Sequence, residues 1–316
     1  EWLFNQNYVE KIYNFSILRN PPKFSGGELF NSTIVPISVI FYQKANPEII
    51  KETITYYAPK TYIKNDVLEG IVIDSSDEKH LPRIECQKKN SKIWKIAMWG
   101  SYLDFELVER ISNQYESLKE YFRNNSILFK TGLNSDSEHP DFMPEKIINA
   151  KKISRYFTLN SSENIIKNDA KYYRKIDKEL FKPPFIILKR FQKDKELVAS
   201  YIDYDAYCTT TGMVINKNIN ILDKKNIVGL INSEFSRYFL FMITSSWGIE
   251  REQINSDEFD VLPFIFDTED KKVADILTKI ISIKKSNEVN QDISHLEKQI
   301  DRIIYNDILK LTEDEQ

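Results

Sequence analysis

The side chains best suited to chemistry are the cations of one segment, residues 146–195. This segment carries 14 Lys and Arg against 5 Asp and Glu, a charge of +9. The whole chain, with 44 cations against 47 carboxylates, has a charge of −3, so the remainder carries −12. A cationic segment in an otherwise acidic chain is expected of a protein that binds a polyanion, because Lys and Arg neutralise phosphates. The alternative is a solvated, lysine-rich surface.

Aromatic side chains are interleaved with these cations. One predicted strand of the segment would give a rigid support to the cations that follow it. The aromatic residues are Tyr156, Phe157, Tyr172, Tyr173, Phe181, Phe185 and Phe191. Lys182-Pro183-Pro184 leads into the apolar run Phe185–Leu188, and Lys189-Arg190 follows it. Such a run after prolines is typical of a buried strand. Side chains at the end of a buried strand are held by the core and still reach solvent, which suits contact with a phosphate or a DNA groove.

If the polyanion is duplex DNA, residue type divides the candidate contacts. The arginine fork can bind guanine O6 and N7 together, whereas lysine more often contacts phosphate. The candidate base readers are therefore Arg174, Arg190 and Arg251. The candidate phosphate partners are Lys171, Lys175 and Lys189, with Tyr172 and Tyr173 stacking or bonding to phosphate and Trp247 beside them.

Residues 226–264 contain an ordered set of motifs. Asn232-Ser233 precedes the aromatic run 238–241, which is followed by Trp247-Gly248, Glu250-Arg251 and Leu262-Pro263-Phe264. This order resembles the end of the TaqI-like target-recognition domain of adenine-N6 DNA methyltransferases. The same domain occurs in the single-chain type II (IIG and IIS) restriction–modification enzymes built on them. The resemblance implies that the chain reads DNA sequence.

Physically, the same stretch predicts mostly scaffold. Apolar residues at three- and four-residue spacing predict one face of a single helix: Val228, Ile231, Phe235, Tyr238, Phe239 and Met242. Leu262-Pro263 predicts an extended exit, because a residue before proline avoids helical geometry. The segment 181–201 and the C-terminal residues 295–316 also resemble the recognition region of these enzymes.

The opening of the chain resembles the closing piece of a class I methyltransferase sheet. It begins at Glu1 and predicts a helix, a strand around Ile12–Phe15 and an antiparallel strand around Ile37–Tyr42, so we expect the C-terminal part of a larger protein. Asn20-Pro21-Pro22-Lys23 is similar to the family's Asn-Pro-Pro-aromatic motif, which holds the target adenine. However, Lys23 cannot stack on a base, and only 19 residues precede the motif. We interpret it as a loop.

The predicted fold class is mixed α/β (α+β), arranged in four segments. Residues 1–45 are predicted to be the remnant of a methyltransferase domain with the terminal strands of its sheet, and 46–125 a connector with a strand and helices. Residues 126–266 are the predicted α+β DNA target-recognition domain, and 267–316 form a C-terminal helical hairpin.

Within the connector, residues 52–65 are predicted to be polar and extended, and the region around Val67 to Ile73 a strand. The same enzymes have a Trp- and Asp-containing segment between their methyltransferase and recognition regions. This chain resembles that segment at Trp94, Trp99, Gly100 and Asp104. Apolar neighbours predict that both tryptophans pack, with base stacking as the alternative.

Composition argues against several other classes. The two distant cysteines and three scattered histidines form no metal or redox spacing, and we expect a reduced, cytoplasmic setting. No apolar run is long enough to cross a membrane. Pro140-Asp141 with Asp169-Ala170-Lys171 fits a loose Mg²⁺ nuclease pattern, but a chain with 29% charged residues produces such spacing by chance.

The resemblance implies a parent enzyme that methylates adenine N6 with S-adenosylmethionine and, in the restriction–modification members, cleaves DNA with Mg²⁺. Because this chain lacks the glycine-rich cofactor loop, we expect it to bind no cofactor and to transfer no methyl group by itself. Its expected partners are double-stranded DNA and the remainder of the parent chain. The alternative function is a non-catalytic module that docks another protein of a DNA-modification or phage-defence complex.

Overall fold

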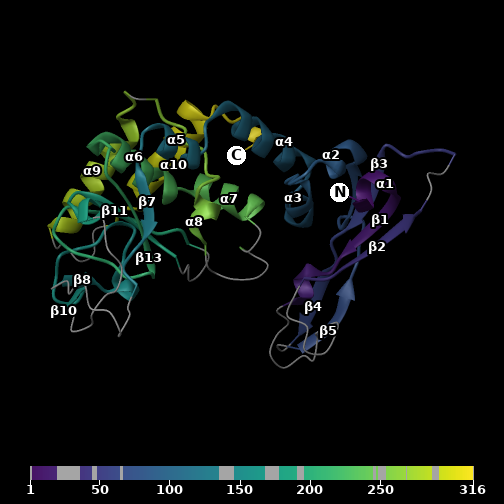
Figure 1. Cartoon of the computed structure of the whole chain (residues 1–316), viewed down its shortest axis with the longest axis horizontal. Coiled ribbons are helices and arrows are strands. Elements are labelled where there is room, and N and C mark those ends of the chain that lie inside the picture. Colours follow the sequence, from purple (N-terminus) through teal and green to yellow (C-terminus); the bar gives the residue numbers. More distant parts are fainter. Residues whose placement is uncertain are drawn as a thin grey trace. The chain divides into compact units, whose positions relative to one another are not determined.

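The computed structural model describes residues 2–19, 36–44, 48–64, 67–134, 146–167, 178–190, 196–244, 247, 254–267, 269–286 and 292–315. Its sheets combine parallel and antiparallel pairs and are interspersed with helices, so the fold is mixed α/β as predicted (Figure 1). The chain divides into two compact units. Unit 1 comprises Glu1–Glu109 and Phe241–Arg251, and unit 2 comprises Arg110–Leu240 and Glu252–Gln316.

Unit 1 contains a four-stranded sheet in the order β2-β1-β3-β6. Its strands are β1 (Tyr8–Asn14), β2 (Ser38–Gln43), β3 (Thr53–Tyr57) and β6 (Glu78–Pro82), preceded by helix α1 (Trp2–Gln6) and with η1 (Ser16–Arg19) after β1. Strand β1 pairs antiparallel with β2 and parallel with β3. The predicted helix and its two antiparallel strands at the opening of the chain are therefore confirmed.

The segment predicted as a polar connection contains two strands, β3 and β4 (Lys60–Lys64). The reason is that β3 consists of threonine, isoleucine and tyrosine, which favour a half-buried pleated surface, and its residues Ile54 and Tyr56 enter the core. Strand β4 pairs antiparallel with β5 (Val67–Val72), the strand predicted around Val67.

Three helices complete unit 1: α2 (Arg83–Gln87), α3 (Ile93–Trp99) and the first part of α4 (Tyr102–Gln114). Trp94 packs against Phe4, with ring centroids 5.2 Å apart, and against Tyr56 at 6.1 Å, as the prediction of a packing role requires. The matched Asp104 accepts a hydrogen bond from the Ser101 backbone N–H at 2.6 Å, where α4 begins. A Cβ at Gly100 would lie 2.8 Å from that carboxylate, so glycine gives the carboxylate room.

Unit 2 is built on a five-stranded sheet in the order β7-β13-β11-β12-β9. The strands are β7 (Leu128–Thr131), β13 (Gly212–Asn216), β11 (Phe185–Lys189), β12 (Ala199–Ile202) and β9 (Tyr156–Phe157). A separate antiparallel pair joins β8 (Lys146–Ile148) to β10 (Ile165–Lys167). The predicted buried strand is confirmed, because every side chain of Phe185–Leu188 is fully buried.

Apolar layers bury the central strands of this sheet. One buried cluster joins side chains of the sheet to those of β8 and η3 (Lys178–Phe181), and includes Phe185, Ile187, Val214, Ile202, Ile147 and Phe181. Helix α6 (Ile221–Ile231) packs against β11 and β12, and α9 (Lys272–Lys285) packs against α6 and β9 (Figure 1). The Cβ of an alanine at Gly229 would lie 2.3 Å from Val273 Cγ1, so glycine allows α6 and α9 to approach closely.

The prediction of one helix through residues 228–242 was wrong, because α6 ends at Ile231 and α7 (Glu234–Ile243) begins three residues later. Asn232 causes the break. Its Nδ2 donates to the carbonyls of Ala199 and Val228, both at 2.8 Å, and its Oδ1 accepts from the Ala199 N–H at 3.0 Å. Ser233 then caps α7 by accepting from the Ser236 N–H.

The remaining elements of unit 2 are α5 (Leu118–Asn124), α8 (Ser256–Phe259), α10 (Ser294–Arg302) with a π-helical continuation (Ile303–Ile308), η2 (Ala150–Lys152) and η6 (Glu313–Glu315). The two tail helices α9 and α10 contact each other, as the predicted hairpin requires. Pro263 forms an isolated antiparallel bridge with Ser117, and the Leu262 carbonyl accepts from the Leu118 N–H at 2.7 Å. Among the described helices, none is long and apolar enough to cross a membrane.

The two units divide the chain differently from the four predicted segments, which stay predictions. Residues 241–251 return to unit 1 from within the predicted recognition domain. The physical reason is packing: the Phe241 ring lies 5.5 Å from the Trp99 ring and 6.2 Å from the Trp247 ring.

Candidate nucleic-acid interface

The end of β11 brings two predicted DNA contacts to the margin of the unit 2 core. Lys189 is the last residue of the strand and pairs with Gly212 of β13, and Arg190 follows it. Both side chains are half-buried, whereas the four residues before them are fully buried. The structure therefore supports the expectation that a rigid core positions these cations.

The Arg190 guanidinium is hydrogen-bonded to other residues of the protein. Its Nη1 donates to the Thr210 carbonyl at 3.2 Å, and its Nη2 donates to Asn255 Oδ1 at 3.0 Å. Its Nε is buried without a hydrogen-bond partner among the described residues. In this arrangement, the fork would have to release both bonds before it could read a guanine. The predicted role of Arg190 as a base reader stays a prediction.

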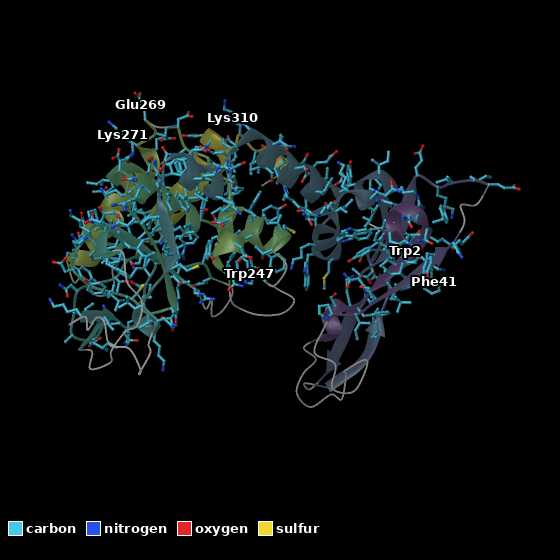
Figure 2. The ribbon with its side chains drawn as sticks, viewed as in Figure 1. Trp2, Phe41, Trp247, Glu269, Lys271 and Lys310 are labelled. Atoms are coloured by element: carbon cyan, nitrogen blue, oxygen red, sulfur yellow. The ribbon has the colours of Figure 1, made fainter. Side chains whose placement is uncertain are left out.

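Trp247 is a core residue of unit 1 in this structure. Its side chain is 1% exposed, and its carbonyl accepts a hydrogen bond from Lys95 Nζ at 2.5 Å (Figure 2). Its indole N–H is buried without a hydrogen-bond partner in the described part of the chain. A contact between this ring and DNA would require it to leave the core, and its predicted DNA-binding role stays a prediction.

The other six candidate contacts lie outside the described residues. They are Lys171, Tyr172, Tyr173, Arg174, Lys175 and Arg251. The lookalike motif at residues 20–23 and both halves of the loose nuclease pattern also lie outside. Their predicted roles stay predictions.

The described cations of residues 146–195 include two groups that sequence alone treated as one. Lys146, Lys151, Lys152 and Lys182 are exposed, the first three on β8 and η2. Arg155 and Arg190 bond inward. Arg155 donates to the Asn232 carbonyl at 2.6 Å and pairs with Glu297 at 3.2 Å. Binding of a polyanion by Arg155 or Arg190 would break these inward bonds, and Lys182 pairs with Glu179 at 4.0 Å, whereas Lys146, Lys151 and Lys152 are exposed.

Three polar residues that sequence analysis did not single out fix the start of β11 and its neighbours. Asn216 Nδ2 donates to the carbonyls of Glu179 and Lys182 at 3.0 and 2.7 Å, and so holds η3 against β13. Lys224 Nζ donates to the Pro184 carbonyl at 2.5 Å, and burial lowers the pKa of this lysine. Asp223 accepts from the Tyr121 hydroxyl at 2.6 Å. The sequence signal that could have indicated buried polar contacts was the presence of polar residues, such as Asp223 and Lys224, inside an apolar helical pattern.

Thiol chemistry is not supported by the surroundings of the cysteines. Burial raises the pKa of both Cys86 and Cys208 to about 12, so each is a neutral thiol near pH 7. Within the described residues, no group of three or more His, Cys, Asp or Glu side chains is placed to hold a metal ion. The exposed lysines of residues 146–195 offer electrostatic binding of an anion.

Comparison with known proteins gives one coarse result. No family model matches the chain, and no curated protein matches it. Among solved structures, the chain is similar to the type IIG restriction endonuclease BpuSI, with a TM-score of 0.40 and 10% identity. The match covers 100% of this chain and 45% of that protein, so the chain spans less than half of its length.

Proposed function

We propose that the chain is the sequence-specific DNA-recognition portion of a restriction–modification enzyme whose parent methylates adenine N6. The observation that carries the proposal is the concentration of charge. Residues 146–195 carry +9 in a chain of −3, and the segment belongs entirely to unit 2. Its exposed lysines lie on β8, on η2 and just before β11, in a unit whose central strands are fully buried, so they present cations on a rigid support.

The motif order at 226–264 supports the same proposal. Asn232 and Ser233, the first residues of that order, hold the α6–α7 junction against β12. In this proposal, unit 2 contacts duplex DNA through lysine–phosphate pairs. S-adenosylmethionine, and Mg²⁺ where the parent cleaves DNA, belong to the remainder of the parent chain. No methyl-transfer step is assigned to the residues of this chain.

Fluorescence anisotropy with a labelled DNA duplex tests the proposal over a series of salt concentrations. We expect log K to fall linearly with log[salt], because each neutralised phosphate contributes about 0.9 to the slope. The charge reversal Lys151→Glu with Lys152→Glu removes two exposed cations of the basic segment and should reduce both affinity and slope. Its matched control is Lys271→Glu with Lys279→Glu, which makes the same charge change on exposed residues outside the segment. Equal effects of the two reversals would refute the proposal.

A second function, docking of another protein, is favoured by strand β2. All six of its residues are exposed or half-buried although four are apolar, and β2 is an edge strand of its sheet. Phe41 and Trp2, both labelled in Figure 2, are 45% and 59% exposed. Exposed apolar edge strands are typical of surfaces that another chain covers.

The remainder of the parent chain, expressed as a separate polypeptide, is the probe for this second function. It should bind the chain, and Phe41→Lys should weaken that binding, while the Lys151/Lys152 reversal should not. Binding that is insensitive to Phe41→Lys would refute docking through β2. The two functions are separable because one depends on unit 2 lysines and salt, and the other depends on unit 1 apolar side chains.

A further inference from the structure

Arg190 joins three segments that are distant in sequence. Its backbone N–H donates to the Thr211 carbonyl at 3.0 Å, and its own carbonyl accepts from the Ile254 N–H at 3.1 Å. Its guanidinium donates to the Thr210 carbonyl and to Asn255 Oδ1. One residue thus ties the end of β11 to the turn before β13 and to the start of α8.

The acceptor on α8 is itself fixed. Asn255 caps the helix in a capping box, in which its own N–H donates to Glu258 Oε2 at 2.9 Å and its side chain accepts from the Glu258 N–H. Ile254 beside it is fully buried. The bond from Arg190 Nη2 therefore ends on an oxygen that is held by the helix start, so it fixes the distance between two chain positions.

These two positions border parts of the sequence that carry further cations. The chain continues from Arg190 into residues 191–195, which include Lys193 and Lys195. It arrives at Ile254 three residues after Arg251, a predicted DNA contact. Because Arg190 is bonded to Ile254 and Asn255, the residue that precedes 191–195 and the residues that follow Arg251 after a short stretch lie side by side in unit 2.

We propose that Arg190 is a positioning residue for DNA binding, acting through Asn255 and not by contact with DNA. The proposal rests on the proposed function and names how one of its residues works. Arginine suits this role because its planar fork directs two donors to two acceptors at once, which the single ammonium of lysine cannot do with the same geometry. The same two donors are the ones that bidentate base reading would need.

A double-mutant cycle in DNA affinity tests the inference. Arg190→Ala, Asn255→Ala and the double variant are compared with the wild-type chain by anisotropy, using the same duplex at one salt concentration. We expect each single change to reduce affinity about tenfold and the double change to reduce it no further, because both remove the same link. Arg190→Lys keeps the charge but loses the fork, and we expect it to behave as Arg190→Ala.

Direct DNA contact by Arg190 predicts the opposite results. Arg190→Lys would then retain most of the affinity, Asn255→Ala would have little effect, and the double variant would lose affinity by the full product of the two single effects. Any of these three results overturns the inference. Lys189→Ala is the matched control, since it removes the neighbouring cation at the end of β11 and leaves the Arg190–Asn255 bond in place, and its effect should multiply with that of Asn255→Ala.

Loss of fold is distinguished by a rescue and by a melting curve. Asn255→Asp keeps an acceptor for Arg190 and a helix cap, so we expect it to retain affinity although it adds a negative charge. Affinities are measured well below the melting temperature of every variant. If Asn255→Asp lowers affinity as much as Asn255→Ala in folded protein, the inference fails. A wild-type chain without salt-dependent binding would refute the proposed function itself, and with it this inference.

Discussion

Strands β11 and β2 are both short and mainly apolar, and their surroundings are opposite. In β11, the side chains of Phe185–Leu188 are 0% exposed, and the strand lies in the middle of its sheet. In β2, Val39 is 42%, Phe41 45% and Tyr42 49% exposed, and the strand is at an edge. The apolar pattern predicts a strand in both cases. What covers its two faces depends on residues far away in sequence.

The contrast separates a strand that stabilises its unit from one that presents a surface. Edge strands of soluble proteins are commonly protected by charged side chains, proline or a bulge. Residues Ser38–Gln43 contain no charged residue and no proline, and the Nζ of Lys11 on the neighbouring strand β1 lies 4.9 Å from the centre of the Phe41 ring. The bulge in this pair lies between Val9 and Lys11 of β1. We therefore expect substitutions in the two strands to have very different effects.

The largest effect is expected for Ile187→Ala at the centre of β11. The change removes a fully buried side chain from the apolar cluster, and we expect the free energy of unfolding to fall by about 2–5 kcal/mol. Val39→Ala in β2 is the matched control and should cost less than about 1 kcal/mol, because its side chain is already partly hydrated. Urea unfolding measures both. Equal losses would show that β2 is buried as deeply as β11.

The next effect is expected for Asn232→Leu, beside the neighbouring strand β12. Leucine leaves the Ala199 N–H and two carbonyls without the side-chain partner they have now, and we expect a loss of about 3 kcal/mol. Asn164→Leu is the control, since it removes one side-chain bond, to the Leu159 carbonyl. Thermal unfolding compares the two. A loss for Asn232→Leu no greater than for Asn164→Leu would mean that the three bonds do not hold the α6–α7 junction.

A smaller effect on stability is expected for Phe41→Ala. The ring contacts Tyr13 at 5.9 Å between centroids and remains 45% exposed, so its removal should cost less than about 1 kcal/mol. Hydrogen exchange of the β2 amides should change little between the variant and the wild type. A loss above about 2 kcal/mol would contradict the assignment of β2 as a surface strand.

The smallest effect on stability is expected for Lys189→Ala, the last residue of β11. The side chain is half-buried, and its replacement should change the free energy of unfolding by less than about 0.5 kcal/mol. If Lys189 contacts a phosphate, the salt slope of DNA binding should flatten by about 0.9, nearly uniformly across sequences. An unchanged slope would remove Lys189 from the interface while leaving the other lysines to be tested.

These differences also show what the sequence could predict. Local patterns were sufficient for the antiparallel opening strands, for the buried run Phe185–Leu188 and for the tail helices, because alternation and apolar runs are local properties. The break at Asn232 was not predictable from periodicity, since it depends on hydrogen bonds to Ala199, 33 positions away in the chain. The strand character of Thr53–Tyr57 was underestimated because its tyrosines and threonines were counted as polar.

The candidate site depends more than the fold on contacts between distant segments, which the sequence does not show. Charge counting located the basic segment but could not tell that Arg155 and Arg190 bond inward, because two acceptors of Arg155 and both side-chain acceptors of Arg190 lie on distant segments. Trp247 was predicted to contact DNA from its place in the motif order, and its burial is set by packing against Phe241 of the same unit. Residue type predicts what a side chain can do, and tertiary contacts decide whether it is available.

Hydrogen–deuterium exchange of the chain with and without duplex DNA tests the central claim most directly. The duplexes should be selected for binding from a random pool, and the exchange followed by peptide. If unit 2 reads DNA through its basic segment, peptides covering residues 146–152 and 178–190 should gain protection, while those of β2 should not change. Protection confined to unit 1, or no protection with duplexes that bind the chain, would contradict the proposed DNA interface.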